Sequence, residues 1–161
     1  ATTLDFLEVI FDEQDVQVNL RGDARACVER ALFQRAVTNL LYNAAQHTAP
    51  GGRIEVRLSG ERGAALVEVS NPGEPITAEQ RARLFERFYR ADMARANSQS
   101  NHGLGLSIVK AVASMHGGSV FVRSEGGVNT FGFTVDAVGP VLAAPELEEG
   151  GRVPQLTPRS V

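Results

Sequence analysis

Segments with helical spacing of apolar residues and segments with alternating apolar residues follow one another in mixed order along this chain. Helical spacing predicts helices at about 3–13, 30–48, 78–90 and 104–115, and alternation predicts strands at about 16–20, 54–58, 66–69, 120–124 and 130–135. Glu61-Arg62-Gly63 joins two predicted strands and is typical of a hairpin. The pattern therefore predicts an α+β fold, a two-layer sandwich in which helices cover one face of a mixed, mostly antiparallel sheet.

A further short strand is expected at residues 26–28, ahead of the second predicted helix. It contains Cys27, the one cysteine of the sequence, which cannot form an internal disulfide. We expect Cys27 to be a small buried hydrophobic residue.

Composition and charge exclude several functional classes. With 161 residues, 43% of them hydrophobic, the chain can bury one core, and its net charge of −3 gives no electrostatic reason to bind nucleic acid or an anionic membrane surface. No uncharged apolar run approaches the roughly 18 residues of a membrane span. We expect one folded domain over residues 1–136 and a flexible tail, rich in Pro, Glu and Gly, over 137–161.

Amide and imidazole groups line one stripe of the helix predicted at 30–48. Asn39 and Asn43 are four residues apart, and Gln46 and His47 follow on the next turn. Amide oxygens can bind Mg²⁺, which keeps several waters and takes further ligands from phosphate. A polar helix face in water explains the same stripe, so the stripe alone does not establish a site.

The loop Asn71-Pro72-Gly73-Glu74-Pro75 follows a predicted strand. Glycine lets the backbone approach a ligand closely, and proline stiffens the loop. An amide at position 71 can pair with the edge of a purine, although the same residues are also common in ordinary turns.

Two further segments suit phosphate. Residues 81–95 carry five arginines, whose planar side chains can donate two hydrogen bonds to phosphate oxygens, and Phe85 and Phe88 are expected to anchor the helix there. Gly103-Leu104-Gly105 begins a predicted helix, where unpaired N–H groups favour anions. Taken singly, solvated arginines and an ordinary helix start explain both segments.

Together and in this order, the four segments resemble the N, G1, F and G2 boxes of the ATP-binding catalytic domain of sensor histidine kinases. Gly127-Val128-Asn129-Thr130-Phe131 completes the set, and the resemblance covers about residues 1 to 136. The loop at 71–73 is similar to that of the heavy-metal (copper or silver) sensor subgroup. The resemblance implies a Bergerat-type fold, with ATP held between two helices beneath a flexible lid.

The resemblance also implies roles for single residues. Asn43 matches the Mg²⁺ ligand, Asn39 supports the same site, and Asn71 occupies the position that reads the adenine amino group. Tyr89 and Arg90 match residues beside the phosphates, so the expected catalytic residues are Asn39, Asn43 and Arg90. The expected ATP-binding residues are Asn39, Asn43, Gln46, His47, Asn71, Gly73, Ile76, Phe88, Tyr89, Arg90, His102, Gly103, Leu104, Gly105, Leu106 and Thr130.

Several positions depart from the family pattern. Asn71 replaces an aspartate and keeps an acceptor oxygen without its charge, and Gln46 replaces a Lys or Arg that commonly contacts phosphate. Asn101 and Asn129 replace glycines, but asparagine tolerates left-handed backbone better than most residues, so we expect the local folds there to persist. Pro75 replaces the last glycine of the G1 box, as in the metal-sensor subgroup.

The implied activity is binding of Mg-ATP and donation of the γ-phosphoryl group to a histidine on a dimerisation domain of the same kinase. No His-Glu/Asp-x-x-x-Pro acceptor motif occurs, and the chain begins at Ala1, so a fragment of a longer protein is expected. A response regulator would act downstream, and the full-length protein would be a membrane-anchored homodimer that senses heavy metal. This chain would be a cytoplasmic, monomeric domain of that inner-membrane sensor.

Two alternatives remain. An ATPase of the related gyrase, chaperone and mismatch-repair group would place a glutamate base one turn before the Mg²⁺ asparagine, but that position is Asn39, which cannot accept a proton at neutral pH. Hydrolysis should therefore be slow. A degenerate nucleotide-binding or docking module is suggested by Gln46, Asn71 and Asn101.

Overall fold

The computed structural model describes residues 3–87, 89 and 105–137. The helices are α1 (Thr3–Glu13), α2 (Arg30–His47), α3 (Ala78–Arg83) and α4 (Gly105–Met115). The strands are β1 (Gln17–Gly22), β2 (Arg53–Glu61), β3 (Ala64–Pro72), β4 (Val120–Glu125) and β5 (Val128–Asp136). None of the helices in these residues combines the length and the apolar character needed to cross a bilayer.

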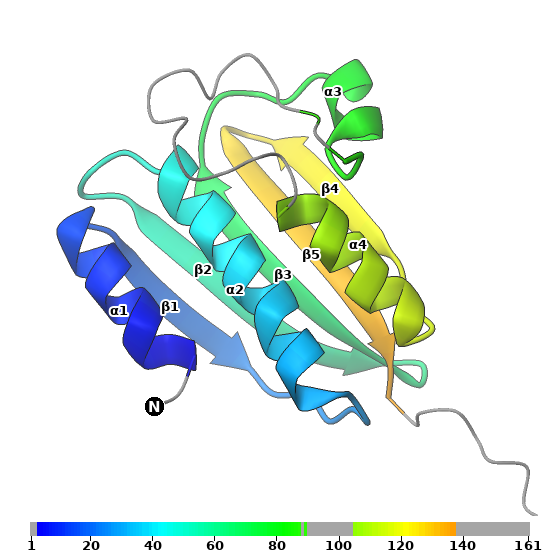
Figure 1. Cartoon of the computed structure of the whole chain (residues 1–161). Helices are drawn as coiled ribbons and strands as arrows, with labels where there is room; N and C mark the ends of the chain where they lie inside the picture. The colour runs from blue at the N-terminus through cyan, green and yellow to red at the C-terminus, as the bar shows by residue number, and fades with distance from the viewer. Residues whose placement is uncertain (1–2, 88, 90–104, 138–161) are drawn as a thin grey trace, which may run out of the picture.

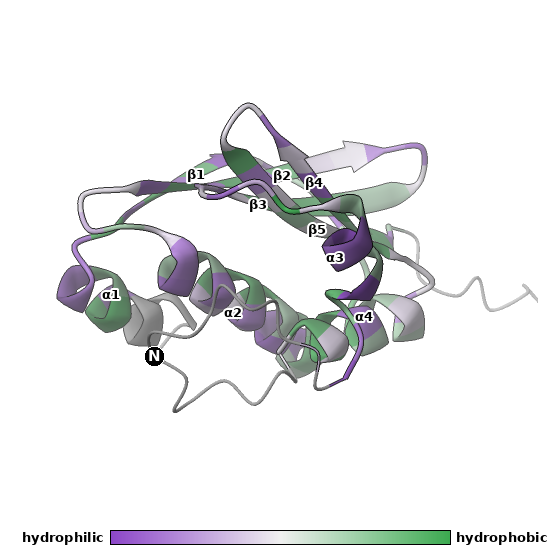
Figure 2. Cartoon of the chain, turned by 90° about the horizontal axis from the view of Figure 1, so that it is seen from above, coloured by the Kyte–Doolittle hydropathy of each residue, from purple (hydrophilic) through white to green (hydrophobic). Residues whose placement is uncertain are grey.

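The five strands form one sheet in the order β1-β2-β3-β5-β4, and α1, α2 and α4 cover one of its faces (Figure 1). Only β1 and β2 are parallel, whereas the other three neighbouring pairs are antiparallel. Seen from above, α1, α2 and α4 form a separate layer beneath the sheet, and α3 lies apart from this layer (Figure 2). The predicted two-layer α+β sandwich with a mixed, mostly antiparallel sheet is confirmed.

Both antiparallel hairpins turn on two residues with positive φ. Arg62 and Gly63 have φ of 50° and 78° between β2 and β3, and Gly126 and Gly127 have φ of 59° and 76° between β4 and β5. Two consecutive positive φ values define the tight turns that match the twist of antiparallel strands. These turns therefore fix the register of each hairpin.

The core lies between the helices and the sheet. Leu40 and Leu41 of α2 are buried against the inner face, where Ile54 and Val69 are fully buried. The ring of Phe33 meets that of Phe133 edge to face, with centroids 5.7 Å apart. Burying side chains of this size stabilises the fold by about 1.5–3 kcal/mol each, so packing on this core holds α2 in place.

Side-chain caps define both ends of α2. The carboxylate of Glu29 accepts hydrogen bonds from the N–H groups of Ala31 and Leu32, which have no partner within the helix. At the other end the Thr48 hydroxyl donates to the Ala44 carbonyl at 2.6 Å. The caps fix where the polar stripe of α2 ends relative to the sheet.

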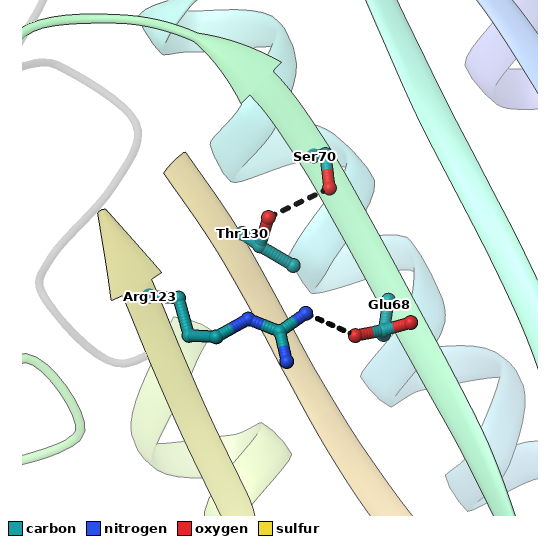
Figure 3. Close-up of polar contacts among 4 residues, drawn as sticks. All are labelled: Glu68, Ser70, Arg123 and Thr130. Atoms are coloured by element: carbon teal, nitrogen blue, oxygen red, sulfur yellow. Dashed lines mark hydrogen bonds and ion pairs between the residues drawn. The ribbon is translucent and has the colours of Figure 1, made fainter. Parts of the chain in front are cut away.

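The opposite face of the sheet is largely polar. The Arg123 guanidinium donates to the Glu68 carboxylate, and the Ser70 and Thr130 hydroxyls lie 2.8 Å apart (Figure 3). Glu68 is nevertheless buried. Specific polar pairs therefore stabilise this face, which the described helices α1, α2 and α4 leave uncovered.

Three local predictions were wrong. Residues 26–28 form no strand, because they pair with no neighbouring strand, although Ala26 and Val28 do pack on the core. Cys27, which lies between them, is exposed rather than buried. The helix predicted at 78–90 ends at Arg83, and the chain continues in tighter turns, in which the Glu86 N–H donates to the Arg83 carbonyl.

Candidate functional site

Asn39 and Asn43 lie one turn apart on α2, and both have a buried side-chain nitrogen. Neither Nδ2 atom has a hydrogen-bond partner among the described residues. A buried amide nitrogen without a partner costs free energy, so this part of α2 is suited to a polar ligand that supplies the missing partner. An amide can turn over without changing shape, so the same positions can also present oxygen to a cation.

Gln46 and His47 complete the stripe at the end of α2. The Gln46 amide donates to the Tyr42 hydroxyl at 2.8 Å, which holds its side chain against the helix. His47 keeps much of its surface in solvent, but the domain behind the ring desolvates it and lowers its pKa below the usual 6.5. His47 is therefore neutral at pH 7, and Gln46 adds no charge.

Asn71 lies near the end of β3 and is almost completely buried, with 1% of its surface exposed. Its Nδ2–H donates to the Pro72 carbonyl at 3.0 Å, whereas Oδ1 has no partner among the described residues. If the amide were turned over, Oδ1 would face the carbonyl oxygen, so the contact fixes its orientation. The site therefore presents one buried acceptor, which suits an amino group.

Gly73, in the loop after β3, lies close to the end of α2 and to two asparagine side chains. A Cβ added at Gly73 would lie 2.9 Å from Asn129 Nδ2, 3.5 Å from Asn71 Nδ2 and 4.0 Å from the His47 carbonyl oxygen. No larger residue fits without a shift of these neighbours. The structure thus brings the predicted residues Asn71, Gly73 and His47 together.

Ile76 and Tyr89 lie on either side of α3. The Ile76 N–H donates to Ser124 Oγ at 2.9 Å, and its side chain packs on the core. The guanidinium of Arg83 lies 4.5 Å from the centre of the Tyr89 ring. Because α3 starts at a reciprocal capping box between Thr77 and Gln80, it holds this corner of the loop in a defined position.

The helix predicted at about 104–115 is present as α4 (Gly105–Met115), and Leu106 packs on the core. Five other predicted site residues lie outside the described residues: Phe88, Arg90, His102, Gly103 and Leu104.

Thr130 differs in position from the other described site residues. Its hydroxyl pairs with Ser70 on the sheet face opposite the helices (Figure 3). Its strand neighbour Asn129 faces the helix layer instead. The structure therefore does not bring the Thr130 side chain to the amides of α2 and β3.

The sequence did not reveal Ser124 or the contacts of Asn129. Asn129 does not use the tolerance of asparagine for left-handed backbone: among the described residues other than glycine, only Asp15 and Arg62 have positive φ. It lies in β5 and forms side-chain hydrogen bonds to Ser124 and to the Glu74 carbonyl. The glycines at 126 and 127 could have revealed this contact, because a tight two-residue turn at these positions sets Ser124 opposite Asn129.

Comparison with known proteins relates this arrangement to one family. Residues 28–138 match the family model described as "Histidine kinase-, DNA gyrase B-, and HSP90-like ATPase". The sensor protein IrlS of Burkholderia pseudomallei is 41% identical over 125 residues, which cover 78% of this chain and 27% of IrlS. The sensor histidine kinase CusS of Escherichia coli K12 is 37% identical, with 83% of this chain and 28% of CusS covered.

The fold also matches solved structures. That of the mycobacterial sensor histidine kinase MprB superposes with a TM-score of 0.72 at 28% identity, covering 85% of this chain and 94% of the solved one. The chain spans about a quarter of the length of the curated relatives it matches.

Proposed function

The chain belongs to the histidine kinase-, DNA gyrase B- and HSP90-like ATPase family, and we propose that it is the ATP-binding catalytic domain of a two-component sensor histidine kinase. In this role it binds Mg-ATP and donates the γ-phosphoryl group to a histidine on a dimerisation domain elsewhere in the same protein.

One observation carries the proposal. Buried amide atoms without partners occur on both elements that would enclose a nucleotide, Asn39 and Asn43 on α2 and Asn71 at the end of β3. Native proteins leave few such atoms, so three of them on the elements that would enclose a nucleotide indicate a polar ligand. The free acceptor of Asn71 suits the 6-amino group of adenine.

The residues present fit a magnesium ion. Asn43 is the residue that would hold Mg²⁺ through its amide oxygen, with Asn39 one turn earlier supporting the same ion. When bound, the ion neutralises charge on the phosphates during transfer. The protein's own contribution is positioning: α2 is capped at both ends and packed on the core, so its amides are held in place before ATP binds.

Transfer is favoured over hydrolysis. In the gyrase-like ATPases a glutamate one turn before the Mg²⁺ asparagine acts as general base, and that position here is Asn39. An amide cannot accept a proton at neutral pH. The neutral ring of His47 lies one turn after Asn43, whereas the base of those ATPases lies one turn before the asparagine. Rapid steady-state ATP hydrolysis by the chain would contradict this assignment.

For the whole protein we propose a membrane-anchored homodimer of the inner membrane, with this domain in the cytoplasm, that passes phosphate to a response regulator. The loop Asn71-Pro72-Gly73 resembles that of heavy-metal sensors, so the proposed signal is a metal ion. These statements concern parts of the protein beyond this chain and are tested on the full-length kinase.

Calorimetry with a non-hydrolysable ATP analogue tests the proposal directly. We expect saturable binding that requires Mg²⁺. Absence of binding at millimolar nucleotide would favour a docking module in place of a kinase domain. Binding together with rapid turnover of ATP would favour the ATPase.

A further inference from the structure

The amide of Asn129 ties the loop after β3 to the β4–β5 hairpin. Its Nδ2–H donates to the Glu74 carbonyl at 2.9 Å, and its Oδ1 accepts from the Ser124 hydroxyl at 2.7 Å. Ser124 Oγ in turn accepts from the Ile76 N–H at 2.9 Å. Two side chains of the hairpin therefore hold the loop at residues 74 and 76.

The same loop sets the orientation of the Asn71 amide. Asn71 and Asn129 are register partners on β3 and β5, and both side chains are buried on the face that carries the helices. A Cβ at Gly73 would meet the amide nitrogens of both residues, and the Gly73 N–H donates to the Gly127 carbonyl at 3.1 Å. The Pro72 carbonyl, which fixes the Asn71 amide, ends β3 and belongs to the same peptide unit as the Gly73 N–H, so a shift of the loop that broke the Gly73 bond would also move this carbonyl.

We infer that Asn129 and Ser124 are positioning residues that set the purine preference of the nucleotide site. They hold the Pro72 carbonyl in the place where it makes Asn71 present an acceptor oxygen. A fixed acceptor binds a 6-amino group and opposes a 6-keto oxygen, so the site prefers ATP to inosine triphosphate (ITP). The inference rests on the proposed function, in which Asn71 faces the base.

Loosening the loop should weaken this preference in a specific way. An Asn71 amide released from the Pro72 carbonyl can turn over and offer Nδ2–H to a keto oxygen. The affinity for ATP then falls while that for ITP is kept or rises. A merely structural role for Asn129 would instead lower stability, or weaken both nucleotides equally.

The test measures dissociation constants for Mg-ATP and Mg-ITP by calorimetry on the 161-residue chain and three variants. Asn129→Ala removes the hydrogen bonds to the Glu74 carbonyl and to Ser124, and Ser124→Ala removes those to Asn129 and to the Ile76 N–H. Each should reduce the ratio of ATP to ITP affinity about three- to tenfold, the worth of one typical hydrogen bond. The matched control is Thr134→Val, which removes the bond from the Ser119 N–H to Thr134 Oγ1 farther along β5 and should leave the ratio unchanged.

The outcomes separate the inference from the function beneath it. If the wild-type chain binds neither nucleotide, the proposed function fails and the inference fails with it. If the wild type prefers ATP and Asn129→Ala keeps that preference, the inference is overturned while the kinase assignment stands. Should Asn129→Ala lose its circular dichroism signal, the ratio measured on Ser124→Ala decides by the same criterion.

Discussion

Arg123 on β4 reaches across β5 and donates to the carboxylate of Glu68 on β3, so this ion pair joins two strands that are not neighbours in the sheet (Figure 3). Only 9% of the Glu68 side chain is exposed, against 54% of Arg123. A carboxylate buried to that degree requires a partner.

Replacement of Arg123 should therefore destabilise the domain through Glu68. Arg123→Ala leaves the buried carboxylate without its donor, and we expect a loss of about 1–3 kcal/mol in the free energy of unfolding. The matched control is Arg21→Ala, whose partner Glu55 has 46% of its side chain exposed, against 9% for Glu68. Urea unfolding should show a loss below about 1 kcal/mol for that variant. Equal losses in the two variants would mean that burial of Glu68 is unimportant.

Gly132 pairs with Phe121 in the β4–β5 ladder, at a position where no larger residue fits. A Cβ at position 132 would lie 2.3 Å from the Phe121 ring and 2.7 Å from the Val67 carbonyl oxygen, and the backbone oxygen cannot move without breaking the ladder. Gly132→Ala should lower the unfolding free energy by about 1–3 kcal/mol. Gly60→Ala on β2, where a Cβ meets nothing within 4 Å, should be neutral in the same thermal unfolding assay. A neutral Gly132→Ala would show that both the Phe121 ring and the β3 backbone at Val67 give way without cost.

Asn43→Ala should abolish magnesium-dependent ATP binding. The change removes the proposed ligand, so we expect affinity in the presence of Mg²⁺ to fall by about 100-fold or more, beyond the loss typical of outer-shell partners. Gln34→Ala removes an amide from the same helix away from the site and should bind ATP like the wild type. Calorimetry with and without Mg²⁺ makes the comparison. Wild-type affinity in Asn43→Ala would remove this residue from the site.

His47 should make stability depend on pH. Burial lowers the pKa of its ring in the folded state, so the unfolded chain binds more protons as the pH falls below about 6.5. Its contribution to stability is therefore complete above pH 6.5 and decreases as the pH falls toward the lower, folded-state pKa. Urea unfolding across this range should show a shallower pH dependence for His47→Gln than for the wild type. Parallel curves would mean that the ring is fully solvated.

Much of the sheet could be predicted because its turns are local. Arg62-Gly63 and the two glycines at 126 and 127 specify tight hairpins from two residues each, and alternation then assigns the faces of the strands. The strand predicted at residues 26–28 was wrong because alternation indicates which side chains are buried, but it does not indicate whether a neighbouring strand is present to pair. Ala26 and Val28 are partly buried as the pattern requires, but no ladder forms.

The site was harder to predict in its details. The sequence identified Asn71 as a candidate, but the orientation of its amide depends on the Pro72 carbonyl, and that depends on contacts with a hairpin more than 50 residues away. For Asn129, backbone tolerance was the wrong property to consider, since the residue acts through its side chain. Alternation alone separates Asn129 from Thr130, because adjacent residues of a strand point to opposite faces.

Strands β3 and β5 pair in the sheet although they lie far apart along the chain, separated by the residues from Gly73 to Gly127. The loop after β3, α3, α4 and β4 all belong to that excursion, whereas each hairpin turn is specified by its own two residues. Closure entropy rises only slowly with the length of a connection, so a change in the length of the chain between α3 and α4 should leave the pairing of the five strands as it is.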